Sequence, residues 1–187
     1  MSARIFAAVK PYSAQVQDKL DALMPEGVPP LQLFTTLARD ERLFERFMAG
    51  GLLDKGHLSL RQREIIIDRV TAKCGSEYEW GVHIAFFAEK VELSSDQIEA
   101  LVHGNGHEPF WSRDEALLIG ACDALLENCD LNDRTWALMT SEFSDEAIME
   151  IIMLVGFYRN VSCLTNSLRL PMEQFAARFP ASNSQDC

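Results

Sequence analysis

The chain has 187 residues, of which 48% are hydrophobic and 24% are charged, and its formal net charge is -11. This length is enough for one domain with a proper core and is short for two. The acidic balance argues against a nucleic-acid partner, which needs clustered Lys and Arg, and against anchoring on anionic membranes. No apolar run approaches the roughly 18 residues of a membrane span, and we expect no cleaved signal at the N-terminus.

The cysteines indicate reduced thiols rather than a disulfide framework. They are five in number and irregularly spaced, at Cys74, Cys122, Cys129, Cys163 and Cys187, and no CxxC occurs. An odd, irregular set of this kind is typical of a reducing compartment. We therefore expect a cytoplasmic protein.

Helical periodicity and capping signals recur along the whole chain, and strand alternation is nearly absent. Capping boxes at Ser59, Ser94 and Ser112 mark three predicted helix starts. The predicted helices cover, in chain order, residues 16–24, 31–48 with a break near 39–41, 59–73, 77–91, 95–103, 113–126, 134–143 and 146–168. Because no linker or composition shift divides them, we predict one all-α domain over residues 1–187, with a polar tail at 181–187.

The predicted helix over 146–168 is apolar around nearly its whole circumference. Such a helix is central in its domain or lies in a subunit interface. The second option predicts a homo-oligomer. Tyr158, Asn160 and Asn166 are polar groups in this apolar setting, and they either reach a pocket or make satisfied interface contacts.

The stretch CGSEYEWGVH, residues 74–83, gathers the side chains with the most chemistry. Ser76, Glu79 and His83 are spaced by three and seven residues, so they share one face of a helix. Glu64 lies in the preceding predicted helix, which a short turn places alongside. We therefore expect Glu64 to face Glu79 and His83 across a groove.

Two carboxylates and an imidazole in an apolar groove form an acid/base device. A nearby carboxylate stabilises protonated His, so His83 would move a proton while Glu64 or Glu79 orients it. Trp80 would then form a wall of the pocket and exclude water. The alternative stays open: Glu64 belongs to a solvated helix face, Glu79 and His83 make an ordinary surface contact, and Tyr78 and Trp80 are core or interface anchors.

The stretch LSLRQREIIIDRVTAKCGSEYEWGVH resembles the core motif of the carboxymuconolactone decarboxylase and alkylhydroperoxidase D-like superfamily. GFYRNVSCLTNSLRLP resembles the superfamily's last long helix, and the resemblance covers about residues 30–172. It implies a small all-helical protein that assembles as a trimer or hexamer. Aligned on His83, the family glutamate falls on Glu64, and the two cysteine positions of peroxidase members fall on Ser76 and Glu79. Thiol–disulfide chemistry needs an attacking and a resolving thiol, and neither residue supplies one.

The resemblance therefore favours the decarboxylase branch of the superfamily. It implies a cofactor-independent lyase that acts on a small carboxylic acid or lactone, with no metal. His83, Glu64 and Glu79 would be catalytic. The residues expected to contact the substrate are Tyr78, Trp80, Ser76 and Cys74. The candidate cations for a substrate carboxylate are Arg61, Arg69 and Arg159.

Two other functions remain open at this stage. One is an alkylhydroperoxidase D-like peroxidase that runs on Cys74 alone, because Cys74 lies near a helix start that favours the thiolate. The other is a non-catalytic helical oligomer that binds a small molecule. His103 and His107 are four residues apart, but the glycines between them and the lack of further ligands argue against a metal site.

Overall fold

The computed structural model describes residues 3–25, 27–52 and 54–181. Within these ranges the chain forms nine α-helices and no strand, which confirms the all-α prediction. The helices are α1 (Ala14–Leu23), α2 (Gln32–Leu37), α3 (Glu41–Ala49), α4 (Leu60–Lys73), α5 (Glu77–Phe87), α6 (Ser95–His103), α7 (Arg113–Asn128), α8 (Asp133–Glu142) and α9 (Asp145–Leu168). All three predicted capping boxes, at Ser59, Ser94 and Ser112, are present.

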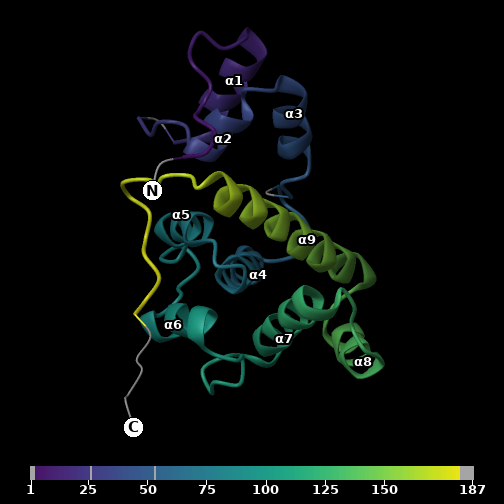
Figure 1. Cartoon of the computed structure of the whole chain (residues 1–187). Coiled ribbons are helices and arrows are strands. Elements are labelled where there is room, and N and C mark those ends of the chain that lie inside the picture. The colour runs from purple at the N-terminus through teal and green to yellow at the C-terminus, as the bar shows by residue number, and fades with distance from the viewer. Residues whose placement is uncertain (1–2, 26, 53, 182–187) are drawn as a thin grey trace.

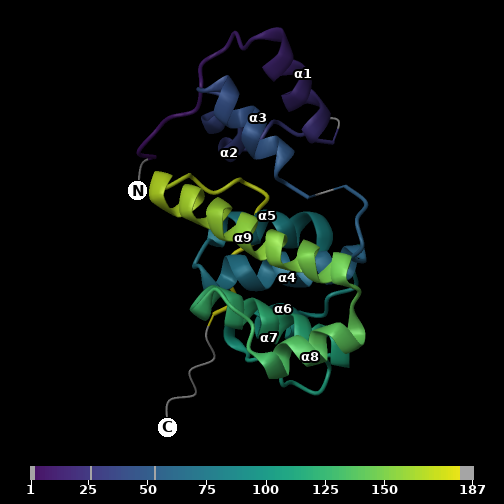
Figure 2. The ribbon, with the colours of Figure 1, turned by 90° about the vertical axis from the view of Figure 1, so that its right-hand side faces the viewer.

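The long helix α9 separates two groups of helices. Helices α1, α2 and α3 lie on one side of it, and α4 to α8 lie on the other (Figures 1 and 2). Helix α4 is central in the larger group, where it contacts α5, α6, α7 and α9. Fully buried Ile66 and Val70 of α4 and Ile151 and Leu154 of α9 belong to the main hydrophobic core. The side chains of α4 that point toward these helices are therefore enclosed.

Helix α4 buries polar side chains as well as apolar ones. Every residue from Glu64 to Thr71 is buried, including Asp68 and Arg69. The alternative prediction of a solvated polar face on this helix is therefore wrong. Because burying a charged group without a partner is costly, the contacts of these side chains show what each one does.

A tight turn joins α4 to α5. Gly75 adopts a φ of +63°, in the left-handed region that glycine enters without steric cost. The amide of Gly75 donates to the carbonyl of Ala72, and the amide of Ser76 donates to the carbonyl of Thr71 at 2.8 Å. This Schellman motif ends α4 and turns the chain straight back, so α4 and α5 pack against each other as antiparallel neighbours.

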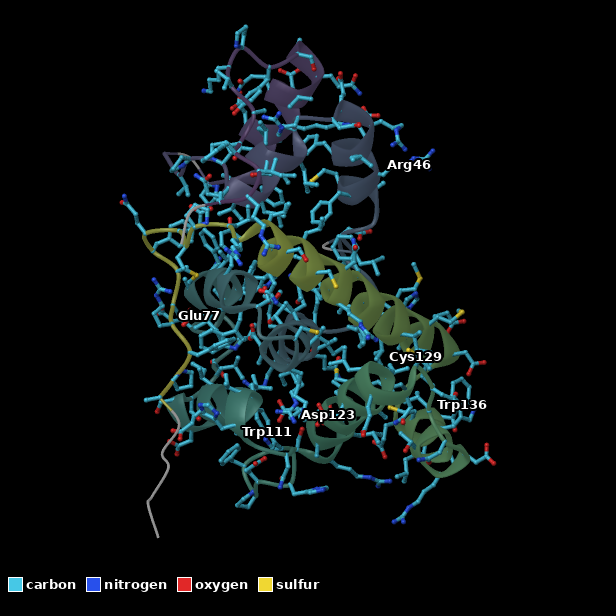
Figure 3. The ribbon with its side chains drawn as sticks, viewed as in Figure 1. Arg46, Glu77, Trp111, Asp123, Cys129 and Trp136 are labelled. Atoms are coloured by element: carbon cyan, nitrogen blue, oxygen red, sulfur yellow. The ribbon has the colours of Figure 1, made fainter. Side chains whose placement is uncertain are left out.

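The segment after α9 crosses α5 and continues to α6 (Figure 1). The amide of Ala177 donates to the carbonyl of Gly81 at 3.0 Å, and the ring of Phe179 packs on Trp80 with centroids 4.9 Å apart. Glu77, at the start of α5, lies beside this segment and accepts from the amide of Phe179 (Figure 3). The segment therefore fixes α5 from outside. The predicted polar tail lies, apart from residue 181, outside the described residues.

Helix α9 combines a buried and an exposed apolar side. By length and composition it is apolar enough to cross a membrane, which corrects the expectation that no segment reaches this length. The core helix of a soluble protein passes the same test, and the inner side of α9 packs on α4. Its outer side exposes Met149 and Met153 by 57% and 60%. A homo-oligomer and a cytoplasmic location stay predictions.

Candidate acid/base site

Four buried polar side chains meet where the three helices α4, α5 and α9 pack together. Glu64 comes from α4, Glu79 and His83 lie one turn apart on α5, and Tyr158 comes from α9. Their exposed fractions are 0%, 7%, 6% and 2%. The structure thus brings together the three residues expected to be catalytic, and it adds Tyr158.

His83 is the centre of this cluster. Its Nδ1 lies 2.7 Å from Glu64 Oε2, so Nδ1 carries a proton and donates it to the carboxylate. Its Nε2 lies 3.2 Å from the Tyr158 hydroxyl and 3.5 Å from Glu79 Oε1. The other oxygen of Glu64 pairs with Arg63 Nε at 3.2 Å. The imidazole is thereby held by a carboxylate on each side.

The two carboxylates favour the protonated ring. Burial by itself lowers the pKa of His83, but the charge and hydrogen bond of Glu64 and those of Glu79 outweigh it and raise the pKa to about 10. Histidine has an ordinary pKa of about 6.5. At neutral pH His83 is therefore an imidazolium, and both of its nitrogens are hydrogen-bond donors.

Asp68 is a further buried carboxyl near this cluster, one turn after Glu64 on α4. Burial raises its pKa well above the ordinary value, the charge of His83 opposes this shift, and the charge of Glu64 adds to it. Its Oδ1 has no hydrogen-bond partner among the described residues. The raised pKa favours the neutral acid, which limits the negative charge collected around His83.

A cavity of about 710 Å³ opens onto the cluster. Glu79, His83 and Tyr158 form a polar part of its wall, while Glu64 lies behind His83. The rest of the wall is mainly apolar and comes from the α1–α3 side, α5 and α9, with aromatic rings from Phe34, Phe47, Phe86, Phe87 and Phe157. Lys90 is the only Lys or Arg that lines it among the described residues. A hydrophobic enclosure with few convergent polar groups is typical of a small-molecule site.

One polar atom at this wall is left without a partner. Glu79 Oε1 faces His83, but its Oε2 is buried and accepts no hydrogen bond from any described residue. A buried carboxylate oxygen of this kind costs free energy unless something donates to it. This cost is not offset by any donor in the described part of the chain.

The predicted substrate-contacting residues on α5 face away from the cavity. Ser76 Oγ bonds with Thr165 Oγ1 at 2.7 Å. The Tyr78 hydroxyl donates to Glu173 at 2.5 Å and accepts from a backbone amide of α2. Trp80 packs on the segment after α9 and does not line the cavity. The expectation that these residues surround a substrate is corrected: they hold α5 to its neighbours.

Cys74 is also away from the cavity. It is the C-cap of α4, not the start of α5, and its carbonyl accepts from the Asn166 side chain at 2.9 Å. A helix C-terminus carries partial negative charge, which disfavours a thiolate. Burial raises the pKa of the Cys74 thiol, against smaller opposing effects of Ser162 and Arg159. The expectation of an activated thiolate here is corrected.

The three arginines considered for substrate binding have other partners. Arg61 pairs with Glu115 at 2.5 Å, and Arg159 donates to a backbone carbonyl and to Cys129 Sγ. Arg69 is buried and makes two hydrogen bonds with Asp123 of α7, which lies below α4 in Figure 3. None of the three lines the cavity.

Lys90, the cation at the cavity, is not among the site residues expected from the sequence, although the sequence carries a signal for it. Glu79, His83, Phe86 and Lys90 recur at intervals of three and four residues, which places them along one side of α5 and its extension. This side is the cavity wall. No group of three or more His, Cys, Asp or Glu in the described ranges is arranged to hold a metal ion.

Comparisons with known proteins agree with this fold. A family model described as the carboxymuconolactone decarboxylase family matches residues 41–118. An uncharacterized peroxidase-related protein from Silicibacter sp. TM1040 superposes with a TM-score of 0.80 at 15% identity, over 95% of this chain and 97% of that one. An alkylhydroperoxidase AhpD core protein, an uncharacterized peroxidase-related protein from Ralstonia eutropha JMP134, gives 0.78 at 16% identity, over 92% and 95%.

The debrominase Bmp8 superposes with a TM-score of 0.73 at 12% identity, over 93% of this chain and 94% of that one. A comparison with curated protein sequences finds no significant match. Over residues 41–118 the chain therefore resembles the carboxymuconolactone decarboxylase family, and its fold is that of alkylhydroperoxidase D-like proteins.

Proposed function

We propose that this protein is a cofactor-independent acid/base enzyme, a decarboxylase-like lyase that acts on an organic acid or lactone. The observation that carries the proposal is the buried His83 ring, which is held between Glu64 and Glu79 at the wall of an otherwise apolar cavity. Strongly perturbed titratable groups that line a cavity are candidates for catalysis.

The arrangement fits the proton that a decarboxylation consumes. When the bond between the substrate carbon and its carboxyl group breaks, CO₂ leaves and the electron pair stays on the substrate as a carbanion or enolate. His83 Nε2–H, which is on the cavity side of the ring, donates a proton to that carbon, and solvent later restores it. Glu64 holds Nδ1 throughout and fixes the ring's orientation.

The surroundings support the same chemistry. The apolar wall lowers the local dielectric, so the charges of His83 and Glu79 act strongly on a bound molecule. The Tyr158 hydroxyl, 3.2 Å from His83 Nε2, is a further polar group beside the atom that would donate the proton. The superfamily match supports a decarboxylase-type reaction, although a debrominase of the same fold shows that the architecture hosts other chemistry.

The alternative of a peroxidase that runs on Cys74 has no comparable support. Cys74 does not line the cavity, and the pKa of its thiol is raised, so little thiolate is present to attack a peroxide. Non-catalytic binding of a small molecule in the same cavity is the outcome that the test below separates from catalysis.

The test is CO₂ release from a panel of carboxylated lactones and unsaturated carboxylic acids. For a substrate turned over by the wild type, we expect His83→Gln and Glu64→Gln to lower kcat by about 10²–10⁴-fold, the usual contribution of general acid/base catalysis. His103→Gln is the matched control, because His103 is exposed and bonds to the carbonyl of Pro180 away from the cavity. Equal turnover in all three variants, or no CO₂ release from the whole panel by wild type, would contradict the proposal.

A further inference from the structure

The cavity is larger and more apolar than a small lactone acid requires. We infer that the substrate is an elongated, predominantly apolar organic acid with two acidic groups, whose reacting carboxyl group lies against His83 and whose second, remote anionic group lies at Lys90. The position of the reacting end rests on the proposed function. The apolar body and the anionic end rest on the cavity itself.

The volume sets the size of the molecule. Pockets of about 300–1,000 Å³ take drug-sized ligands, and this one measures about 710 Å³. A small lactone would leave most of the apolar wall in contact with water. Because each Å² of apolar surface removed from water is worth about 25 cal/mol, a body that fills the space gains most of its affinity there.

The order of side chains on α5 sets the direction of the molecule. Glu79 and His83 come first, Phe86 and Phe87 follow on the next turn, and Lys90 comes after the helix ends. With a rise of about 1.5 Å per residue, Phe87 lies roughly 6 Å beyond His83 along the helix, and Lys90 follows in the turn after it. A polar reacting end, an apolar body and a charged end match this order.

Aromatic rings surround the middle of the cavity. The rings of Phe47 and Phe157 pack at an angle of 45° with centroids 5.1 Å apart, and His83 stacks on Phe87 with centroids 5.5 Å apart. All four of these residues line the cavity. A wall of this kind accepts an alkyl chain or flat rings and offers no partner for polar groups in the middle of a ligand.

The charges place the second anionic group at the far end. At the near end, His83 Nε2–H faces the reacting carboxyl group, and Glu79 Oε2 is enclosed and has no donor within the described chain. At the far end, the exposed Lys90 ammonium lies 5.1 Å from the Phe87 ring centroid, and no ion pair with Lys90 occurs among the described residues. Asp54, exposed and also at the cavity wall, weakens the attraction for an anion.

Isothermal titration calorimetry with unreactive probes tests this inference. We expect octanoate to bind at least about ten-fold more tightly than succinate, because only octanoate fills the apolar wall. Lys90→Met should weaken octanoate about five-fold and leave 1-octanol within about two-fold, as loss of one partly exposed charge contact predicts. Asp54→Asn should tighten octanoate and leave 1-octanol unchanged.

Lys55→Met is the matched control, because Lys55 is exposed and does not line the cavity. Succinate binding as tightly as octanoate, or Lys90→Met acting equally on octanoate and 1-octanol, would overturn the inference. These probes bind without turnover, so the result is independent of the lyase proposal. If His83→Gln abolishes catalysis but octanoate does not bind, the lyase proposal stands and this substrate class is excluded. If octanoate binds as expected but His83→Gln keeps full catalysis, this substrate class stands and the lyase proposal is excluded.

Discussion

Helix α4 carries two buried polar clusters that differ in one respect. Arg69 makes hydrogen bonds of 2.8 and 2.6 Å to the two oxygens of Asp123, and it also donates to the carbonyl of Leu101 at 3.0 Å. Both charged groups of this cluster have partners, and neither residue lines the cavity. The cluster around His83 opens onto a cavity and leaves Glu79 Oε2 without a donor.

The difference separates structural from functional polar groups on one helix. A network in which both charged groups have partners fixes the position of α7 against α4. An incomplete network retains an atom whose desolvation is not offset within the chain. Burial and charge alone do not distinguish the two, since Arg69 and Glu64 are both almost fully buried.

The Arg69 cluster should show its role in stability. Asp123→Ala leaves the buried Arg69 charge without its carboxylate, and breaking a buried pair in this way costs about 3–5 kcal/mol. We expect urea unfolding to show a loss toward the lower end of this range, because Asp123 is 29% exposed. Glu127→Ala, an exposed change on the same helix, should stay within about 0.5 kcal/mol. Similar stability of the two variants would mean that the Arg69 pair does not hold α7.

Substitution of Asp68 should change the free energy of unfolding by less than Asp123→Ala does, and it should stabilise the fold rather than destabilise it. Its pKa is raised in the folded protein. The free energy of unfolding therefore falls as the pH rises above about 4, which is the ordinary pKa of Asp in the unfolded chain. Asp68→Asn removes this loss. Relative to wild type, the variant should therefore gain about 1 kcal/mol or more between about pH 4 and pH 8, the scale of one buried unpaired polar group.

Urea unfolding at both pH values measures that gain. Asp96→Asn, an exposed change in the first turn of α6, is the control and should show no such dependence on pH. A constant difference between Asp68→Asn and wild type across the range would mean that Asp68 is ionised in the folded protein.

The helices and the meeting of Glu64, Glu79 and His83 could be predicted because both depend on local rules. Capping boxes mark where helices begin, and residue spacing with a short turn decides which faces of α4 and α5 meet. The predicted helix over 77–91 ends at Phe87 instead, where the chain leaves the helix before the next cap.

The roles of the side chains around that cluster could not be predicted. Trp80 packs on Phe179 and Tyr78 bonds to Glu173, so their partners lie 99 and 95 residues further along the chain. Arg69 finds Asp123 on a different helix. Helical spacing gives the face on which a residue lies, but the tertiary packing decides whether that face meets a cavity, another helix or the segment after α9.

The central claim is that His83 is an imidazolium held between two carboxylates. If so, the free energy of this interaction stabilises the fold fully below about pH 6.5 and is lost as pH rises toward about 10, because the folded-state pKa lies above the unfolded one. The same pKa sets the pH range in which His83 can donate a proton, because its protonated form persists until the pH approaches about 10.

The most direct measurement is an NMR titration of the His83 ring in protein labelled with ¹⁵N-histidine, assigned by comparison with His83→Gln. We predict a pKa of about 10 in the wild type and a lower value in Glu64→Gln, which keeps a hydrogen-bond acceptor but removes the charge. A His83 that titrates near the ordinary value of about 6.5 in both proteins would contradict the account.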